Sequence, residues 1–432
     1  MASNNEITTI KPLTIIGLIS GTSMDGIDAV IEQISWENDK PNFITLNAET
    51  YPYKDKKLIQ ALRNIEPGKN LTGTEYDEKI ANEFSNAALQ ITKKADLSPK
   101  NIDYIASHGQ TVWYIPKSKN QKKTKASIIG NGNIIAKTTK IKTIFDFRTA
   151  DINAGGLGAP LSPILHFYRF PPESIILNIG GIANLTAIDS KPDINNLIAF
   201  DTGPGNFLID ELVRFYSKEK ETCDTNGSWS SKGTPNKEIV NELLKHEYFS
   251  EPYPKATDRK LFNPELLQKL LKFSEKNKLS PFDTIATAAL LTAKSVALAV
   301  RQCEPPRHPE FPRHPERSEG SRTTPVIASS TVIASPFVIA SPPVIASEAK
   351  QSLKRLIVVG GGRLNPTLMN QLAAELPALD VMPSEQLNIN GDFLEAELMA
   401  FLGFLTANGF PGNIPHITGA EYPVVLGKVV EP

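Results

Sequence analysis

The chain has 432 residues and a formal net charge of −1, so a basic surface for nucleic acid or an anionic membrane is not expected. Hydrophobic residues make up 40% of it, enough for a large core in two domains or in one unit with two lobes. The first residues do not resemble a signal peptide, and the 2 cysteines have no metal-ligand spacing, so we expect a cytoplasmic protein.

Near the N-terminus, two apolar stretches flank a polar tip. Residues 13–19 and 27–34 predict the strands of a hairpin, because both are rich in β-branched residues. The tip, GTSMDG, is long for a hairpin and combines hydroxyls, glycines and Asp25, with Asp28 just after it. We interpret it as a site for nucleotide phosphates and a metal ion, although an ordinary turn uses the same residue types. No Gly-Lys-Ser/Thr follows, so the tip is not a P-loop.

Two further polar stretches follow predicted strands. Residues 101–107 predict a strand that ends at His108 and Gln110, which either contact sugar hydroxyls or are satisfied within a loop.

A strand predicted at residues 142–147 is followed by Arg148 and Asp151, just before a glycine-rich turn. Because arginine binds a carboxylate with a fork of N–H donors, this pair indicates either a carboxylate-bearing substrate or a structural ion pair.

The middle of the chain carries a candidate catalytic carboxylate, Asp201. Strands are predicted around it at residues 174–179, 182–188 and 197–200, and then a helix with Leu208, Leu212 and Phe215 on one face. Gly203 and Gly205 lie between Asp201 and this helix. Glycines let a backbone approach a polyanion, and N–H groups at a helix start favour negative charge. The stretch therefore predicts a base beside a phosphate site, or, more plainly, a tight turn with a capping Asp.

The composition changes abruptly over residues 304–352, which contain PRHPE twice and VIAS four times. Such a segment predicts a low-complexity insert that loops out of the fold and carries no site residue.

A strand predicted at residues 353–359 is followed by Gly360, Gly361 and Gly362. Asn365 then has the position of a helix N-cap, before a proline. Three glycines exceed what capping needs, so this turn predicts a flat surface for adenine or ribose.

Seven separated motifs occur in order: GLISGTSMDGIDAV, ASHGQT, FDFRTADINAGGLGAPL, LNIGGIANLT, FDTGPGN, VVGGGRLNP and NIPHITGA. Together they resemble the anhydro-N-acetylmuramic acid kinases, members of the sugar kinase, actin and chaperone ATPase superfamily. The resemblance covers nearly the whole chain except residues 304–352.

The resemblance implies an α/β fold with two lobes of the actin-like ATPase (ribonuclease H-like) type, in which mixed sheets are flanked by helices around a central cleft. Residues 1–150 would form the first lobe, joined by the C-terminal helix within residues 391–432. Residues 151–390 would form the second lobe and contain the insert.

It also implies an ATP-dependent enzyme of peptidoglycan recycling. Such enzymes open the 1,6-anhydro bridge of the sugar with water and phosphorylate the 6-hydroxyl, giving N-acetylmuramic acid 6-phosphate and ADP. ATP and Mg²⁺ would be required, and the partners would be the anhydro-sugar and ATP. Whether the enzyme forms a homodimer is left undecided by the resemblance. Where family members usually carry KSTGRE, this chain has KATDRK at residues 255–260, and we assign no site residue there.

The expected site residues combine the resemblance with the motifs. Asp201 would be the catalytic base, and no residue is assigned to a metal. ATP would contact Gly21, Thr22, Ser23, Met24, Asp25, Gly26, Ile27, Asp28, Gly203, Gly205, Gly360, Gly361, Gly362 and Asn365. The sugar would contact His108, Gln110, Arg148 and Asp151.

Two alternatives remain at this point. One is a kinase of another sugar in the same superfamily, and the other is a nucleotide-gated binding protein without sugar kinase activity.

Overall fold

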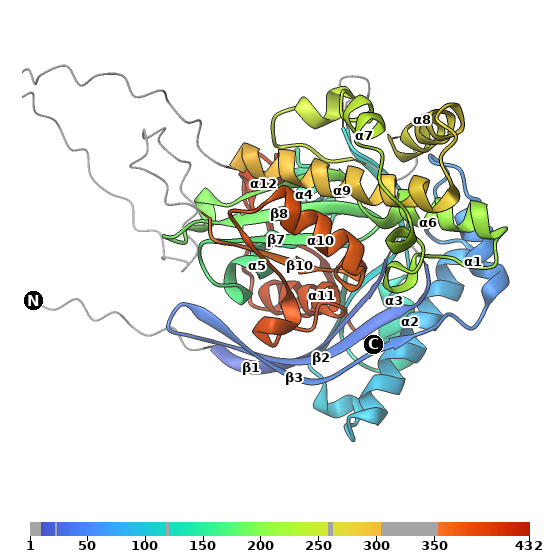
Figure 1. Ribbon diagram of the computed structural model, residues 1–432. Coiled ribbons are helices and arrows are strands. Elements are labelled where there is room, and N and C mark those ends of the chain that lie inside the picture. The colour runs from blue at the N-terminus through green and yellow to red at the C-terminus, as the bar shows by residue number, and fades with distance from the viewer. Residues whose placement is uncertain (1–9, 22–23, 118–120, 122, 258–261, 304–352) are drawn as a thin grey trace, which may run out of the picture.

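The computed structural model describes residues 10–21, 24–117, 121, 123–257, 262–303 and 353–432. They form two mixed β-sheets with helices packed on their faces (Figure 1), so the α/β class expected from the sequence is confirmed. The predicted insert at residues 304–352 lies outside the described residues.

The first sheet contains the N-terminal hairpin. Its strand order is β12-β6-β4-β1-β2-β3, with β5 paired to β4. The strands are β1 (Ile10–Ser20), β2 (Ile27–Glu37), β3 (Lys40–Tyr51), β4 (Tyr104–Ile115), β5 (Lys125–Ile129), β6 (Thr143–Phe145) and β12 (Lys428–Val430). β1, β2 and β3 are antiparallel neighbours, whereas β4 runs parallel to β1. The predicted hairpin is therefore present, and its strands extend beyond the predicted bounds.

The second sheet carries Asp201. Its strand order is β11-β10-β7-β8-β9. The strands are β7 (Ser174–Ile179), β8 (Ile182–Ile188), β9 (Ile198–Pro204), β10 (Arg355–Val359) and β11 (Asp380–Pro383). β7, β8 and β9 form an antiparallel meander, and β10 runs parallel to β7. The strand that carries Asp201 is thus at the edge of the sheet.

Helices cover both sheets. They are α1 (Lys56–Arg63), α2 (Glu75–Lys94), α3 (Gly132–Thr139), α4 (Thr149–Asn153), α5 (Pro163–Arg169), α6 (Asn206–Ser217), α7 (Lys237–Leu243), α8 (Phe262–Lys276), α9 (Pro281–Cys303), α10 (Pro366–Glu375), α11 (Leu394–Ala407) and α12 (Pro415–Thr418). α9 is long and apolar enough to span a membrane, but 83% of its most apolar window is buried inside the protein. It is packed as a core helix, with α10 beside it in Figure 1.

The C-terminal helix α11 packs on the N-terminal sheet. A Cβ atom on Gly17 would lie 2.0 Å from the carbonyl oxygen of Ala396, so only glycine allows this approach of β1 to α11. One buried cluster joins residues from both sheets, including Ile15, Ile176 and Phe401. The helix α11 therefore packs on the first sheet, whereas the division into two lobes with boundaries at residues 150 and 390 stays a prediction.

One predicted helix face is wrong in part. Leu208 and Leu212 of α6 are buried as expected, but Phe215 is 61% exposed. Ile209 and Val213 take the remaining inward positions, which turns Phe215 toward solvent. The apolar stripe thus runs along one side of the helix, and Phe215 lies just outside it.

Two buried carboxyl groups lie where α11 meets the first sheet. Glu32 of β2 is fully buried; its Oε1 accepts a hydrogen bond from Thr45 at 2.6 Å. Glu397 of α11 forms an ion pair with Arg169 of α5, whose Nη2 lies 3.0 Å from Glu397 Oε2. Burial raises the pKa of Glu32 to about 7, the charge of Glu397 adds to the rise, and the Thr45 bond and Arg169 oppose it. Burial also raises the pKa of Glu397.

We predict that Glu32→Gln stabilises the protein more at high pH than at low pH. The folded state holds this proton up to a pH of about 7, whereas an unfolded Glu releases it near about 4.3. Stability of the wild type therefore falls as pH rises between these values, and the amide variant avoids this loss. Melting temperatures at about pH 5 and about pH 8 test this, because both lie near the ends of that interval.

The control for this prediction is Glu37→Gln, at the exposed end of the same strand, which should leave the pH dependence of the wild type intact. An equal stability difference between Glu32→Gln and wild type at both pH values would contradict the prediction.

Candidate active site

Asp201 is held at three points by the segment that follows α7. Its backbone N–H donates to the carbonyl oxygen of Lys255 at 3.2 Å, and its own carbonyl accepts from Tyr248 Oη at 2.7 Å. The N–H of Thr257 donates to Asp201 Oδ2 at 2.8 Å. β9 continues through Asp201 to Pro204 instead of ending at residue 200 as expected. The carboxyl group is therefore fixed by strand and loop together.

The environment of Asp201 differs from that of an ordinary surface Asp. Burial raises the pKa of Asp201 to about 7, while the Thr257 N–H, Arg148 and Lys255 act in the opposite direction. A base with a pKa near the working pH is well suited to general base catalysis.

Lys255 is a site residue that the sequence analysis left out. Its side chain is buried, with Nζ 3.1 Å from the Tyr248 carbonyl oxygen. Nζ also lies 5.4 Å from the ring centre of Phe200 and 4.9 Å from that of Tyr248. Lys255 and Thr257 are two positions at which KATDRK agrees with the family pattern KSTGRE, and this agreement could have indicated their role.

Arg148 is held by two acceptors. Its Nε donates to His108 Nε2 at 3.0 Å, and its Nη1 donates to the Gly158 carbonyl oxygen at 2.8 Å. Burial lowers the pKa of His108 to about 3, and the charge of Arg148 adds to this, so the imidazole is neutral. Nε2 is then the acceptor, and the proton lies on Nδ1, 3.2 Å from the Gly109 carbonyl oxygen. His108 thus contacts Arg148, which itself interacts electrostatically with Asp201.

Gln110 contacts the hairpin tip. It is fully buried, its Nε2 donates to the Gly21 carbonyl oxygen at 3.1 Å, and its Oε1 accepts from Tyr53 Oη at 2.9 Å. Both His108 and Gln110 lie inside β4 and not at a strand end, so the expected position of this motif is wrong.

Asp151 is fully buried, and both its oxygens accept hydrogen bonds. Oδ2 accepts from the Gly158 N–H at 2.7 Å, and Oδ1 accepts from Asn413 Nδ2 at 2.7 Å and from Thr418 Oγ1 at 2.6 Å. These bonds occupy the carboxylate within the protein.

Some described residues of the hairpin tip are buried in the fold, and one is exposed. Met24 is buried in the core, and the Gly26 carbonyl oxygen accepts from Ser20 Oγ at 2.6 Å. Ile27 is also buried, whereas Asp25 is exposed. Thr22 and Ser23 lie outside the described residues. Within the described tip, Asp25 is therefore the side chain best placed to meet a ligand.

Asp28 follows the tip at the start of β2. Its Oδ1 accepts from Thr50 Oγ1 at 2.6 Å. Burial raises the pKa of Asp28 to about 6, and the charges of Glu395, Asp25 and Asp392 add to the rise, while the Thr50 bond lowers it.

Glu395, which had no predicted role, stands at the start of α11. Its Oε1 accepts from Asn178 Nδ2 at 3.3 Å. Although Glu395 is exposed, loss of contact with bulk water at its carboxyl group raises its pKa. The hydrogen bond from Asn178 and the charge of Arg148 lower the pKa. Arg148 thus interacts electrostatically with carboxyl groups from β9 and α11, Asp201 and Glu395.

The start of α6 differs from the expectation. The N–H groups of Gly205 and Asn206 donate to the carbonyl oxygens of Gly181 and Gly180 at 3.0 and 2.8 Å, and that of Phe207 donates to Gly181 at 3.2 Å. These N–H groups are therefore not free as expected, whereas contact of ATP with Gly203 and Gly205 stays a prediction. The Gly203 backbone, with a φ of +135°, adopts a conformation that suits glycine.

Within the late glycine turn, Gly361 is less closely packed than Gly360 and Gly362. A Cβ on Gly360 would lie 2.3 Å from Asn178 Oδ1, and one on Gly362 would lie 2.4 Å from the Ile179 side chain. A Cβ on Gly361 would have no neighbour closer than 3.6 Å. Asn365 caps α10 as predicted, and its Nδ2 donates to Asp224 Oδ2 at 3.1 Å, so its side chain is engaged inside the protein.

The family described as anhydro-N-acetylmuramic acid kinase matches residues 13–309 and 338–432. This chain belongs to that family. Residues 310–337, inside the predicted insert, fall between the two matched ranges.

Curated members of the anhydro-N-acetylmuramic acid kinase family align with nearly the whole chain. Those of Caldanaerobacter subterraneus subsp. tengcongensis and Microcystis aeruginosa are each 35% identical to it over 96% of its length, covering 96% and 100% of the relatives. The kinase of Photobacterium profundum is also 35% identical, over 96% of this chain and 97% of its own. A solved ligand-bound xylulose kinase from Lactobacillus acidophilus matches with a TM-score of 0.39 and 10% identity, over 97% of this chain and 94% of its own.

The residues of this family member fit a magnesium nucleotide in one respect. Asp25 and Asp28 offer the hard oxygen ligands that Mg²⁺ prefers. Among the described residues, no group of three or more His, Cys, Asp or Glu side chains is arranged to hold a metal ion. An ion that arrives with ATP commonly takes most of its ligands from phosphates and water, so a dedicated protein cage is not required.

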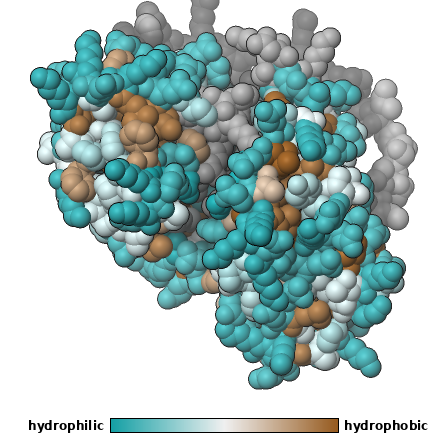
Figure 2. Space-filling model, turned by 90° about the vertical axis from the view of Figure 1, so that its right-hand side faces the viewer, coloured by the Kyte–Doolittle hydropathy of each residue, from teal (hydrophilic) through white to brown (hydrophobic). Residues whose placement is uncertain are grey.

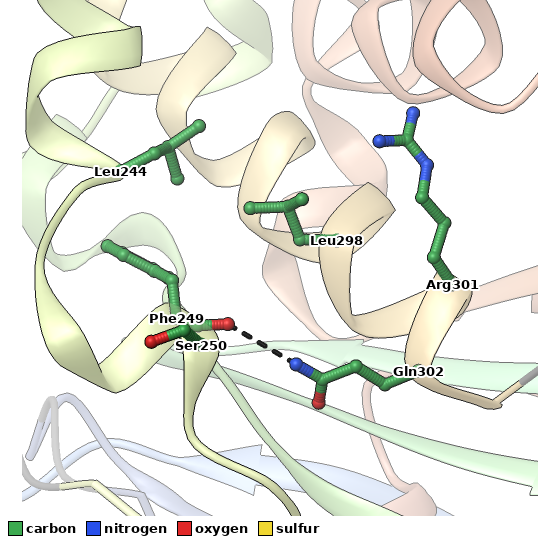
Figure 3. A pocket seen from close by; sticks show the side chains of 6 residues that line it. All are labelled: Leu244, Phe249, Ser250, Leu298, Arg301 and Gln302. Carbon is green, nitrogen blue, oxygen red and sulfur yellow. Dashed lines mark hydrogen bonds between the residues drawn. The ribbon is translucent and has the colours of Figure 1, made fainter.

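On the face of the kinase shown in Figure 2 the described residues form two masses, and the expected cleft between two lobes stays a prediction. A separate open pocket of about 340 Å³ lies near the C-terminal end of α9 (Figure 3). Its wall includes Phe249, whose ring lies 2.9 Å from where a Cβ on Gly203 would stand. Gln302 Nε2 donates to the Phe249 carbonyl oxygen at 3.3 Å and closes one side. Phe249 thus separates this pocket from the turn after Asp201.

We predict that Lys255→Met moves the acid limb of the pH–rate profile to higher pH. The positive charge of Lys255 lowers the pKa of Asp201, so its removal keeps the base protonated to a higher pH. Because a base acts when deprotonated, kcat/KM should begin to rise later, by up to about one pH unit. Initial rates between about pH 5 and about pH 9 measure the shift.

The matched variant Lys255→Arg keeps the charge and should keep the acid limb near that of the wild type. If the Met variant lost activity equally at every pH, Lys255 would stabilise the loop without tuning the base.

Proposed function

We propose that this protein uses ATP to convert 1,6-anhydro-N-acetylmuramic acid into N-acetylmuramic acid 6-phosphate in peptidoglycan recycling, with Asp201 as general base. The observation that supports it most is a fixed carboxyl group with a pKa near about 7 that interacts electrostatically with Arg148. The sugar of this family carries both a carboxylate and an acetal carbon that water must attack. A base and an arginine fork side by side match these two features.

Asp201 would accept a proton from a water molecule while the oxygen of that water bonds to carbon 1 of the sugar. The bond between carbon 1 and the bridging oxygen breaks in this step. The freed oxygen on carbon 6 bonds to the γ-phosphorus of ATP, and ADP leaves. Mg²⁺ supplies charge neutralisation on the phosphates when it is bound. Glu395, which interacts electrostatically with the same arginine, would help to orient this water.

The remaining site residues divide into two groups in this proposal. Asp25, Asp28 and the turn around Gly361 would meet the nucleotide, because Asp25 is exposed, Asp28 is half-buried and Gly361 is loosely packed. The N–H groups of Arg148 other than those used by His108 and Gly158 bind the sugar carboxylate. His108, Gln110, Asp151 and Asn365 hold these groups in place instead of contacting ligands, because each is engaged within the protein.

The proposal places the enzyme in the cytoplasm, where ATP is available. Its partners are then two small molecules, and a homodimer stays a prediction.

We predict that Asp201→Asn lowers kcat by about 100-fold or more, the usual scale of general base catalysis. The KM values for sugar and ATP should change little, because the group acts mainly in the transition state. The measurement is ADP release by the purified protein with and without the anhydro-sugar. Wild-type release should require the sugar; slow release independent of it would support the nucleotide-gated binding protein instead.

Asp189→Asn, at the end of β8 in the same sheet, is the matched control and should keep the wild-type rate. Turnover of the Asp201 variant within a few-fold of wild type would falsify the assignment of the base, since Asn retains the shape of Asp.

We predict that Asp25→Ala raises the KM for Mg·ATP by about tenfold, the scale seen when a group supporting a bound metal is lost. The KM for sugar should stay within about twofold of wild type, because Asp25 is exposed at the hairpin tip, where the proposal places the nucleotide and not the sugar. Steady-state kinetics with each substrate varied in turn separate these effects. Glu37→Ala, at the other end of the hairpin, is the control, and equal losses for both substrates would mark Asp25 as a residue of the fold.

A further inference from the structure

The last motif of the chain, NIPHITGA at residues 413–420, contacts the loop that carries Arg148. Asn413 Nδ2 and Thr418 Oγ1 both donate to Asp151 Oδ1, at 2.7 and 2.6 Å. Thr418 is the last residue of the short helix α12, Asn413 precedes this helix, and Asp151 belongs to α4. A carboxylate in the middle of the loop is thus held by a segment more than 260 residues later in the sequence.

The contact continues along the backbone on both sides of Asp151. The N–H of Leu157 donates to the Thr418 carbonyl oxygen at 2.7 Å, and the N–H of Glu421 donates to the Ala154 carbonyl oxygen at 2.7 Å. Asp151 Oδ2 accepts from the Gly158 N–H at 2.7 Å. The C-terminal segment and the glycine turn therefore form one hydrogen-bonded unit.

This unit ends at the guanidinium group. Gly158 accepts from Arg148 Nη1 at 2.8 Å through its carbonyl oxygen and donates to Asp151 through its N–H. Gly158 has a φ of +70°, and a Cβ on it would lie 2.9 Å from Ile152 and 3.3 Å from Arg148 Cβ. Gly158 thus links the two side chains directly, so a change in the position of Asp151 would move the acceptor of Arg148.

The same short helix also reaches the strand that leads to Asp201. His416 Nε2 lies 2.9 Å from the carbonyl oxygen of Leu197, just before β9 begins. α12 therefore contacts both the loop of the arginine and the strand of the base.

We propose that Asn413 and Thr418 are positioning residues for the kinase reaction, which act on Arg148 through Asp151 and Gly158. The inference rests on the proposed binding of the sugar carboxylate by Arg148. A long arginine side chain loses conformational freedom when it binds, and hydrogen bonds that orient it beforehand reduce this cost. A small displacement of such a group lowers activity strongly even when the altered residue is remote from the reaction.

The test compares Thr418→Val with Thr418→Ser. Valine keeps the shape of threonine and removes the donor to Asp151, so kcat/KM for the anhydro-sugar should fall by about tenfold to 100-fold. The KM for ATP should stay within about twofold of wild type, because the proposal assigns the nucleotide to the hairpin tip and to the turn around Gly361. Serine restores the hydroxyl and should restore most of the activity toward the sugar. Equal loss toward both substrates, or the same loss in the serine variant, would overturn the proposal.

A double variant tests whether the effect passes through Arg148. Arg148→Lys alone should lower kcat/KM for the sugar, and Thr418→Val added to it should have an effect of less than about twofold, because the group it orients is already lost. If the fold-loss in kcat/KM of the double variant equalled the product of the losses in the two single variants, the proposal would be overturned. If Arg148→Lys alone changed nothing, the proposed role of Arg148 in sugar binding would fail instead, and the two failures are thereby distinguished.

A second variant covers the case in which Thr418→Val does not fold. Asn413→Ala removes the other donor to the same oxygen of Asp151 and should give the same selective loss toward the sugar. Normal sugar kinetics in a folded Asn413→Ala protein would overturn the proposal for this residue. Melting temperatures of all variants are compared with that of the wild type, because a purely structural role would lower stability without separating the two substrates.

Discussion

A single carboxyl group, kept partly out of water at the edge of the second sheet, sets the requirements that the rest of the site meets. Burial of Asp201 raises its pKa to about 7, so its charged form is costly unless positive charge and N–H donors surround it. The Thr257 N–H, Arg148 and Lys255 provide these. The protein thus keeps this carboxyl group close to the point of ionisation, where a proton can be accepted and released near neutral pH.

The same logic explains why the surroundings of Asp201 come from distant parts of the chain. Lys255 is itself buried, and it is stabilised by the Tyr248 carbonyl and two aromatic rings. Arg148 is oriented by His108, which burial keeps neutral and therefore able to accept a hydrogen bond. The two cationic side chains are thus oriented by neutral groups of the fold itself.

Much of the fold could be predicted from local patterns. The bounds of β7 and β8 agree with the sequence because an apolar run ends at two glycines, and Asn365 caps α10 because its local geometry suffices. The carbonyl partners of the α6 N–H groups could not be predicted, since Gly180 and Gly181 reach them through sheet packing. The bond from Thr418 to Asp151 and the pKa of Asp201 likewise depend on tertiary contacts that no local window contains.

The central claim is that Asp201 activates the water that opens the sugar. The most direct measurement is a crystal structure of the Asp201→Asn variant with 1,6-anhydro-N-acetylmuramic acid and Mg·ATP bound. The account predicts a water molecule near carbon 1 within about 2.6–3.2 Å of the residue 201 side chain, with the sugar carboxylate on Arg148. A sugar bound with carbon 1 turned away from residue 201, so that this side chain meets only the phosphates, would contradict it.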